Sequence, residues 1–308
     1  MVGEPAVMTR RRLLAAAAAA ALLAAPASAR AAPARKLKAV ATISVLGDLV
    51  KNVGGDRVDV TTLVGPNADA HIFSPTPGDA RMVAAADIVF VNGLGLEGWM
   101  TRLIVASGTK APTVVVTKGI AARKVDEGGA QRRAEIDPHA WQSVANVKIY
   151  VANIRDGLAA VDPAHQAIYD ANAQAYLGKL DELEREVKAA IAGIPAGRRK
   201  IITNHAAFGY FGDAYGVEFI APEGVSTDAE PSAKDIASII AQIRRQKIPA
   251  VFLENITDPR LIREIARETG AAIGGALYSD ALSEPGGPAG TYIAMMRHNV
   301  HEMTKALG

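Results

Sequence analysis

The chain has 308 residues, a formal net charge of +2 and no cysteine. Residues 1–29 contain three basic and one acidic side chain, so the rest of the chain has no formal net charge and no basic stripe of the kind that binds nucleic acid. Without cysteine the chain forms neither disulfides nor a thiolate metal site, while its length suffices for two lobes of ordinary domain size.

The N-terminus has the pattern of a secretory signal peptide over residues 1–29. Arg10, Arg11 and Arg12 precede an apolar run over 13–25, and small residues follow at 27–29. Such a run is shorter than the ~20 residues that span a bilayer. Residues 9–14 also approximate a twin-arginine signal, and ordinary Sec signals carry similar basic residues, so both export routes stay open. Because no cysteine is present to accept a lipid, we predict a periplasmic protein without a lipid anchor.

Strands and helices alternate over residues 30–161, which predicts an N-terminal α/β lobe. The expected strands are 39–44, 58–63, 88–92 and 113–116, and the expected helices are 46–53, 78–86 and 96–107. The strands are almost wholly apolar, which is typical of parallel strands buried on both faces.

The same alternation returns over residues 196–308 and predicts a second, similar lobe. Here the expected strands are 201–203, 217–220, 249–253 and 272–277, and the expected helices are 208–215, 234–246 and 259–269. The predicted fold is therefore α/β, with two similar lobes that each contain a mainly parallel sheet.

A long helix is predicted between the lobes, over residues 162–195. Asp162 and Pro163 resemble an N-cap followed by proline at the first helical position, and no further proline occurs before residue 195. Apolar or aromatic residues recur in steps of four and three at Tyr169, Ala173, Tyr176, Leu180, Leu183, Val187, Ala190 and Ile194. A coiled-coil dimer is the alternative, but so few heptads favour packing against the chain's own lobes.

Three of the six histidines and one aspartate occupy unusual local positions. His71 and His139 lie in turns flanked by proline, and His205 and Asp280 each follow an expected strand. Open α/β sheets place their ligand groups in such loops. Each residue alone also fits a structural role: a hydrogen-bonded histidine in a turn or core, or an aspartate that caps a helix. Together they are candidates for a metal site.

Around these residues the chain resembles the zinc and manganese solute-binding proteins of bacterial ABC importers. The resemblance rests on the motifs Asp69-Ala70-His71 with Pro75-Thr76-Pro77, Asp137-Pro138-His139-Ala140-Trp141, His205-Ala206-Ala207-Phe208-Gly209-Tyr210-Phe211, and Tyr278-Ser279-Asp280 with Leu282-Ser283. It implies two α/β lobes joined by one long rigid helix. It also implies that His71 and His139 from the first lobe, with His205 and Asp280 from the second, hold one metal ion. The expected partners are an ABC permease and its ATPase in the inner membrane, and the expected state is a monomer.

Three imidazole nitrogens and one carboxylate oxygen suit a borderline divalent ion such as Zn²⁺. Each imidazole must be neutral to bind the ion, so binding should weaken as the pH falls through ~6.5. Manganese receptors of the family often have a second carboxylate in place of the third histidine, so His205 favours zinc. Many zinc members carry a histidine-rich insertion, however, and residues 119–136 contain no histidine. We therefore predict high-affinity uptake of Zn²⁺, with a manganese-specific receptor as the alternative.

A zinc-dependent hydrolase is the rival class of function. The sequence contains neither HExxH nor GxSxG, and a shell closed by four protein ligands has no free position for a catalytic water, so no enzyme is predicted. A receptor for siderophores, haem or cobalamin would leave four converging ligands unexplained. Glu254 and Asn204 are candidates for orienting an imidazole, although polar residues at strand ends are commonly structural.

Overall fold

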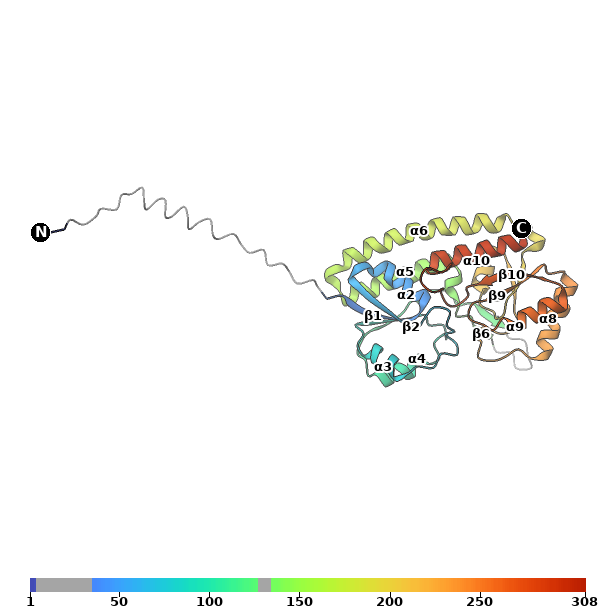
Figure 1. The fold of residues 1–308 in the computed structure, drawn as a ribbon, viewed down its shortest axis with the longest axis horizontal. Coiled ribbons are helices and arrows are strands. Elements are labelled where there is room, and N and C mark those ends of the chain that lie inside the picture. The colour runs from blue at the N-terminus through green and yellow to red at the C-terminus, as the bar shows by residue number, and fades with distance from the viewer. Residues whose placement is uncertain (4–34, 127–133) are drawn as a thin grey trace. The chain divides into compact units, whose positions relative to one another are not determined.

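The computed structural model describes residues 1–3, 35–126 and 134–308, and Lys36–Gly308 form one compact unit. Apart from Met1–Gly3, the predicted signal peptide lies outside the described residues. Within the compact unit, two parallel four-stranded sheets are flanked by helices, and the long helix α6 (Gln166–Ala192) runs past both of them (Figure 1). The predicted α/β fold of two similar lobes joined by one long helix is confirmed.

The first sheet has the strand order β2-β1-β3-β4, and all of its neighbouring strands are parallel. Each predicted strand and helix of this lobe has a counterpart: β1 (Leu37–Ile43), α2 (Ser44–Gly54), β2 (Val58–Val64), α3 (Pro77–Ala84), β3 (Ile88–Val91), α4 (Met100–Ser107) and β4 (Thr113–Val115). The apolar side chains of β3 are buried throughout, as expected for a central strand covered on both faces.

Helix α4 begins at Met100, four residues later than predicted. The Glu97 carboxylate accepts hydrogen bonds from the backbone N–H groups of Asn92 (2.6 Å) and Gly93 (3.0 Å) and from the Thr42 hydroxyl (2.6 Å). Gly93 has a φ of 84°, which lies in the left-handed region and does not continue into a helix. The buried carboxylate therefore stabilises a loop where the apolar pattern suggested the first turn of the helix.

The second sheet repeats the topology of the first. Its strands are β7 (Lys200–Ile202), β8 (Glu218–Ile220), β9 (Ala250–Glu254) and β10 (Ala272–Leu277), all parallel, in the order β10-β9-β7-β8. When the strands of each lobe are numbered along the chain, both sheets have the order 2-1-3-4. The accompanying helices are α7 (Gly209–Tyr215), α8 (Ala233–Gln246), α9 (Arg260–Thr269) and α10 (Tyr292–Leu307).

Three elements in the C-terminal part of the predicted first lobe were not predicted. Strands β5 (Lys124–Asp126) and β6 (Ala134–Ile136) form an antiparallel pair. Helix α5 (Val144–Val161) follows and packs against α2 and α6. Apart from the adjacent pair Tyr150 and Val151, its buried positions recur in steps of three and four: Val144, Val147, Tyr150, Val151, Ile154 and Leu158. The amphipathic period of α5 is therefore present in the sequence, within a segment rich in β-branched residues.

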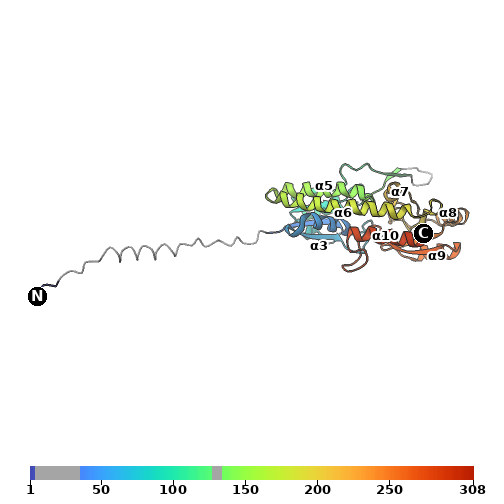
Figure 2. The ribbon, with the colours of Figure 1, turned by 90° about the horizontal axis from the view of Figure 1, so that it is seen from above.

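Helix α6 is shorter than the predicted segment 162–195, because Pro163–His165 form a separate 3₁₀ turn in front of it. At its C-terminal end Ile191 is buried, whereas the predicted Ala190 is only partly buried. This shift is expected, because a straight helix of 3.6 residues per turn drifts away from a strict heptad pattern. The buried stripe contacts α2, α5 and α10 of the same chain, and Figure 2 shows α5 and α10 on either side of α6. Among the described residues, no helix is both long and apolar enough to cross a membrane.

Candidate metal centre

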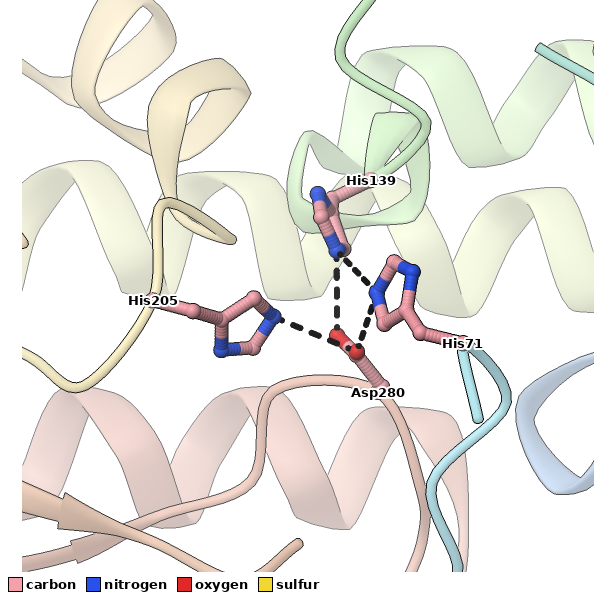
Figure 3. Close-up of side chains that lie close together, drawn as sticks. All are labelled: His71, His139, His205 and Asp280. Atoms are coloured by element: carbon pink, nitrogen blue, oxygen red, sulfur yellow. Dashed lines mark hydrogen bonds and ion pairs between the residues drawn. The ribbon is translucent and has the colours of Figure 1, made fainter. Parts of the chain in front are cut away.

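The four predicted metal ligands lie in four different loops, and the structure brings all of them together (Figure 3). His71 follows β2 and precedes α3, and His139 lies between β6 and α5. His205 follows β7, and Asp280 follows β10. Two ligands thus come from each half of the chain, as the resemblance implied, and those that follow parallel strands lie at the carboxyl ends of the sheets.

The separations between the donor atoms fit a single small ion. His71 Nε2 lies 3.3 Å from His139 Nε2 and 3.1 Å from Asp280 Oδ2. His205 Nε2 lies 3.3 Å from Asp280 Oδ2, and His139 Nε2 lies 3.5 Å from Asp280 Oδ1. Bonds of about 2.0–2.1 Å to a tetrahedral zinc ion place neighbouring donors roughly 3.3 Å apart. No two of the four ligand atoms are more than 4.8 Å apart.

The site is shielded from solvent, and its charged groups strongly affect one another's pKa. His139 and His205 are fully buried, and Asp280 is 1% exposed. Burial by itself raises the pKa of the Asp280 carboxyl, but the neighbouring His139 and His205 lower it to well below the usual value. Asp280 Oδ1 and His205 Nε2 have no hydrogen-bond partner among the described residues. Buried polar atoms normally have one, so this donor set fits a bound cation.

Asp137 orients the ring of His139. Its Oδ1 atom accepts hydrogen bonds from the backbone N–H of His139 (3.0 Å) and from the ring Nδ1 (2.9 Å). An ionised carboxylate only accepts hydrogen bonds, so the proton is assigned to Nδ1 and the Nε2 lone pair is free to bind a metal ion. Burial lowers the pKa of His139, but Asp280 and Asp137 outweigh it and raise the pKa above its usual value.

Glu254 lies against the ring of His205 and binds the loop that carries it. Its Oε2 lies 2.6 Å from His205 Nδ1, and its Oε1 accepts the backbone N–H groups of Asn204 (2.7 Å) and His205 (3.0 Å). Burial lowers the pKa of His205, but the Glu254 and Asp280 carboxylates raise it well above its usual value. Glu254 therefore fixes both the ring and the loop that carries it.

His71 lies at the wall of a surface cavity. This cavity has a volume of about 520 Å³ and is lined by His71, by the loop after β3, by Pro138, and by Val225 and Ser226 of the second lobe. Beside it, Asp69 accepts the backbone N–H of His71 (2.8 Å) and the Thr227 hydroxyl (2.5 Å). The loop between β8 and α8 is thus attached to the first lobe next to His71.

The loop of Asp280 is anchored on both sides. The Ser279 carbonyl accepts hydrogen bonds from Trp141 Nε1 (2.8 Å) and Gln142 Nε2 (2.7 Å). Farther along, the Leu282 backbone N–H donates to Ser44 Oγ (2.9 Å), and its carbonyl accepts the backbone N–H of Asn67 (2.9 Å). These contacts with the first lobe fix the carboxylate of the second.

Sequence reasoning identified the cluster of four but not all of its supports. Glu254 contacts an imidazole as suggested, whereas only the backbone of Asn204 takes part, and its side-chain oxygen has no hydrogen-bond partner in the described part of the chain. Asp137 belongs to the motif of His139, and its position two residues before the histidine is the local signal for this contact. Thr227 lies in a loop without a motif, so no local signal pointed to it.

Comparisons with known proteins all point to one family of metal-binding proteins. A family model described as "Zinc-uptake complex component A periplasmic" matches residues 39–306. The iron-binding protein YfeA of Yersinia pestis is 35% identical over 275 residues, covering 89% of this chain and 88% of that protein. The manganese-binding lipoprotein MntA of Halalkalibacterium halodurans is 36% identical over 271 residues, covering 88% of each.

Solved structures agree with these matches. The periplasmic zinc-binding protein TroA from Treponema pallidum superimposes with a TM-score of 0.82 at 33% identity, covering 89% of this chain and 99% of that one. The three relatives carry names that refer to iron, manganese and zinc, so they agree on a bound metal but differ in the ion.

Proposed function

Because the chain belongs to the family described as zinc-uptake complex component A, periplasmic, we propose that it captures one divalent transition-metal ion and delivers it to an ABC import permease. Members of this family are metal-binding receptors of ABC transporters and are not enzymes. The observation that supports the proposal is the convergence of three imidazole nitrogens and one carboxylate in a buried site.

The proposed ligands are His71, His139, His205 and Asp280. Their separations fit one ion, and four protein ligands leave no position for a catalytic water of the kind a zinc hydrolase needs. Metal analysis of the purified protein, with a screen for ester and peptide hydrolysis, tests this choice. One ion per chain without turnover supports the receptor, whereas turnover that depends on the metal would favour the hydrolase.

Zinc is the proposed cargo, and manganese is the alternative. An N₃O donor set suits Zn²⁺, while Mn²⁺ prefers sites richer in oxygen, and the general order of affinities also places zinc above manganese. Affinity in vitro therefore cannot identify the physiological ion. The discriminating measurement is the metal content of the protein recovered from its native compartment without chelators. Zinc would support the proposal, and manganese would assign the chain to the relatives named for that metal.

The proposed location is the periplasm, after cleavage of a signal peptide near residue 29. Some relatives are named lipoproteins, whereas this sequence has no cysteine to carry a lipid. Fractionation of cells followed by intact-mass measurement tests this proposal. A protein that starts near residue 30 in the soluble periplasmic fraction supports it, and a membrane-bound or lipid-modified form contradicts it.

The partners are the permease and the ATPase of the importer, with the receptor itself a monomer. We propose the functional division 30–161, 162–195 and 196–308, in which the two lobes contribute two ligands each. Analytical ultracentrifugation with and without metal tests the monomer. A sedimentation coefficient that rises with protein concentration would contradict it.

A further inference from the structure

Arg123 lies between β4 and β5 and connects two carboxylates. Its Nε donates to Asp213 Oδ2 on α7 (2.9 Å), and its Nη1 donates to Asp137 Oδ2 (3.3 Å). The Asp213 side chain is 67% exposed, whereas that of Asp137 is fully buried. One guanidinium therefore joins a surface residue of the second lobe to the buried carboxylate that orients His139.

The backbone of Arg123 also contacts α7 and Asp137. Its N–H donates to the Tyr210 hydroxyl (2.8 Å), and its carbonyl accepts the backbone N–H of Asp137 (2.9 Å). The Tyr210 hydroxyl in turn donates to the Asp137 carbonyl (3.3 Å). Both the side chain and the main chain of Arg123 are thus connected to α7 on one side and to Asp137 on the other.

Gly209 makes room for this arrangement. A Cβ atom at this position would lie 2.4 Å from Arg123 Nη1 and 2.6 Å from Asp137 Oδ2. Gly209 is the first residue of α7 and lies four residues after the proposed ligand His205. The short segment that carries His205 therefore also contacts the Arg123 guanidinium, which lies behind His139.

We propose that Arg123 is a positioning residue that couples His139 to the segment carrying His205. This inference rests on the proposed metal-receptor function. While α7 is in place, Arg123 holds Asp137, and Asp137 holds the imidazole. A displacement of α7 that moves His205 away also withdraws Asp213 and Tyr210 from Arg123.

Such a coupling would loosen two ligands together and make release of the metal cooperative. Removal of the arginine would leave Asp137 buried without its cation, which is costly for the arrangement around His139. The positive charge itself repels a metal ion, so any gain in metal affinity from Arg123 must come from positioning rather than from charge.

The test measures the dissociation of Zn²⁺ into excess chelator and the visible spectrum of the Co²⁺-substituted protein. We expect Arg123→Ala to weaken metal binding by roughly 10- to 100-fold, mainly through faster dissociation, and to change the Co²⁺ spectrum. Arg123→Lys keeps the charge but lacks the fork that reaches both carboxylates, so it should resemble the alanine variant. Thermal melts of each variant establish that it is folded.

Gly209→Ala provides a second route to the same effect, because its methyl group would overlap both the Arg123 guanidinium and the Asp137 carboxylate and separate them from His139. It should reproduce the fast dissociation, and combining it with Arg123→Ala should add little further effect. Gly178→Ala on α6 is the matched control, because a Cβ at that position would meet no other part of the described chain within 4 Å beyond its own helical turn, and it should leave the dissociation rate unchanged.

Wild-type dissociation and an unchanged Co²⁺ spectrum in Arg123→Ala would overturn the proposal, as would full rescue by lysine or additive effects of the two substitutions. A wild-type protein that holds no metal would instead reject the proposed function. If the wild type binds metal tightly and Arg123→Ala changes neither the dissociation rate nor the Co²⁺ spectrum, only the coupling is rejected.

Discussion

Replacing Glu254 with glutamine would exchange an accepting oxygen for a donating nitrogen at the ring of His205. The amide oxygen of glutamine can still accept the two backbone N–H groups that Glu254 Oε1 binds now. The amide nitrogen then occupies the position 2.6 Å from His205 Nδ1. Two donors would face each other there, so the ring must either turn away or move its proton to Nε2. Either change removes Nε2 as a metal ligand.

The expected magnitude follows from the contacts. A buried polar group without a partner costs about 1–3 kcal/mol, which corresponds to a roughly 5- to 150-fold change in affinity. Loss of the partner of a metal-binding histidine typically weakens binding by about 10- to 100-fold. We therefore expect Glu254→Gln to bind metal about 10- to 100-fold more weakly while it remains folded, since the two side chains have nearly the same size.

Competition with a chromophoric chelator at fixed pH and ionic strength measures this change. Glu218→Gln is the matched control, because Glu218 lies in the same sheet and its side chain forms an exposed ion pair with Lys200 (2.8 Å). Such pairs contribute little, so the control should titrate like the wild type. A Glu254→Gln protein with wild-type affinity would refute the idea that Glu254 sets the proton position of His205.

Three further predictions concern the Thr227–Asp69 hydrogen bond beside His71, the pH dependence of stabilisation by metal, and the packing of the long helix. Thr227→Val removes the hydroxyl that donates to Asp69, so metal should dissociate about fivefold faster in a stopped-flow measurement, for a loss of about 1 kcal/mol. An unchanged rate would contradict a role of this hydrogen bond in retaining the metal. In the metal-free protein, burial lowers the pKa of His139 and His205, but the neighbouring carboxylates outweigh it and raise the pKa. Protonation therefore stabilises the folded metal-free protein fully below pH 6.5, the pKa of histidine in the unfolded chain, and this stabilisation is lost as the pH rises through the raised pKa. The increase in melting temperature caused by metal should therefore grow with pH above about 6.5, and a constant or shrinking increase would argue against it. Leu180→Ala should cost about 2–5 kcal/mol in urea unfolding without changing the metal content, because Leu180 is fully buried on α6; a loss below 1 kcal/mol would contradict this packing.

The sequence predicted what is encoded locally. Parallel strands are recognisable because they are continuously apolar, and the polar residue at the end of a strand identifies the loop of the site. His205 and Asp280 were found in this way, and so was Glu254 as a candidate partner. The long helix was found because its apolar period continues without proline, and only its ends differ from the prediction.

What could not be predicted depends on contacts between residues far apart in the chain. Thr227 and Asp69 are separated by 158 positions, and Arg123 and Asp213 by 90. No local pattern shows that such residues will meet. The start of α4 was wrong for a related reason, since the buried Glu97 carboxylate binds the backbone of the preceding loop, and propensity alone does not show this.

Metal analysis after equilibrium dialysis tests the central proposal most directly, with wild type and Asp280→Ala measured side by side. Asp280 is the proposed ligand whose carboxylate lies within 3.5 Å of all three imidazoles. We predict one tightly held ion per wild-type chain and a large loss of affinity in Asp280→Ala, with both proteins folded by circular dichroism. A folded wild type without tight metal, or an Asp280→Ala protein that retains one ion with unchanged affinity, would contradict it.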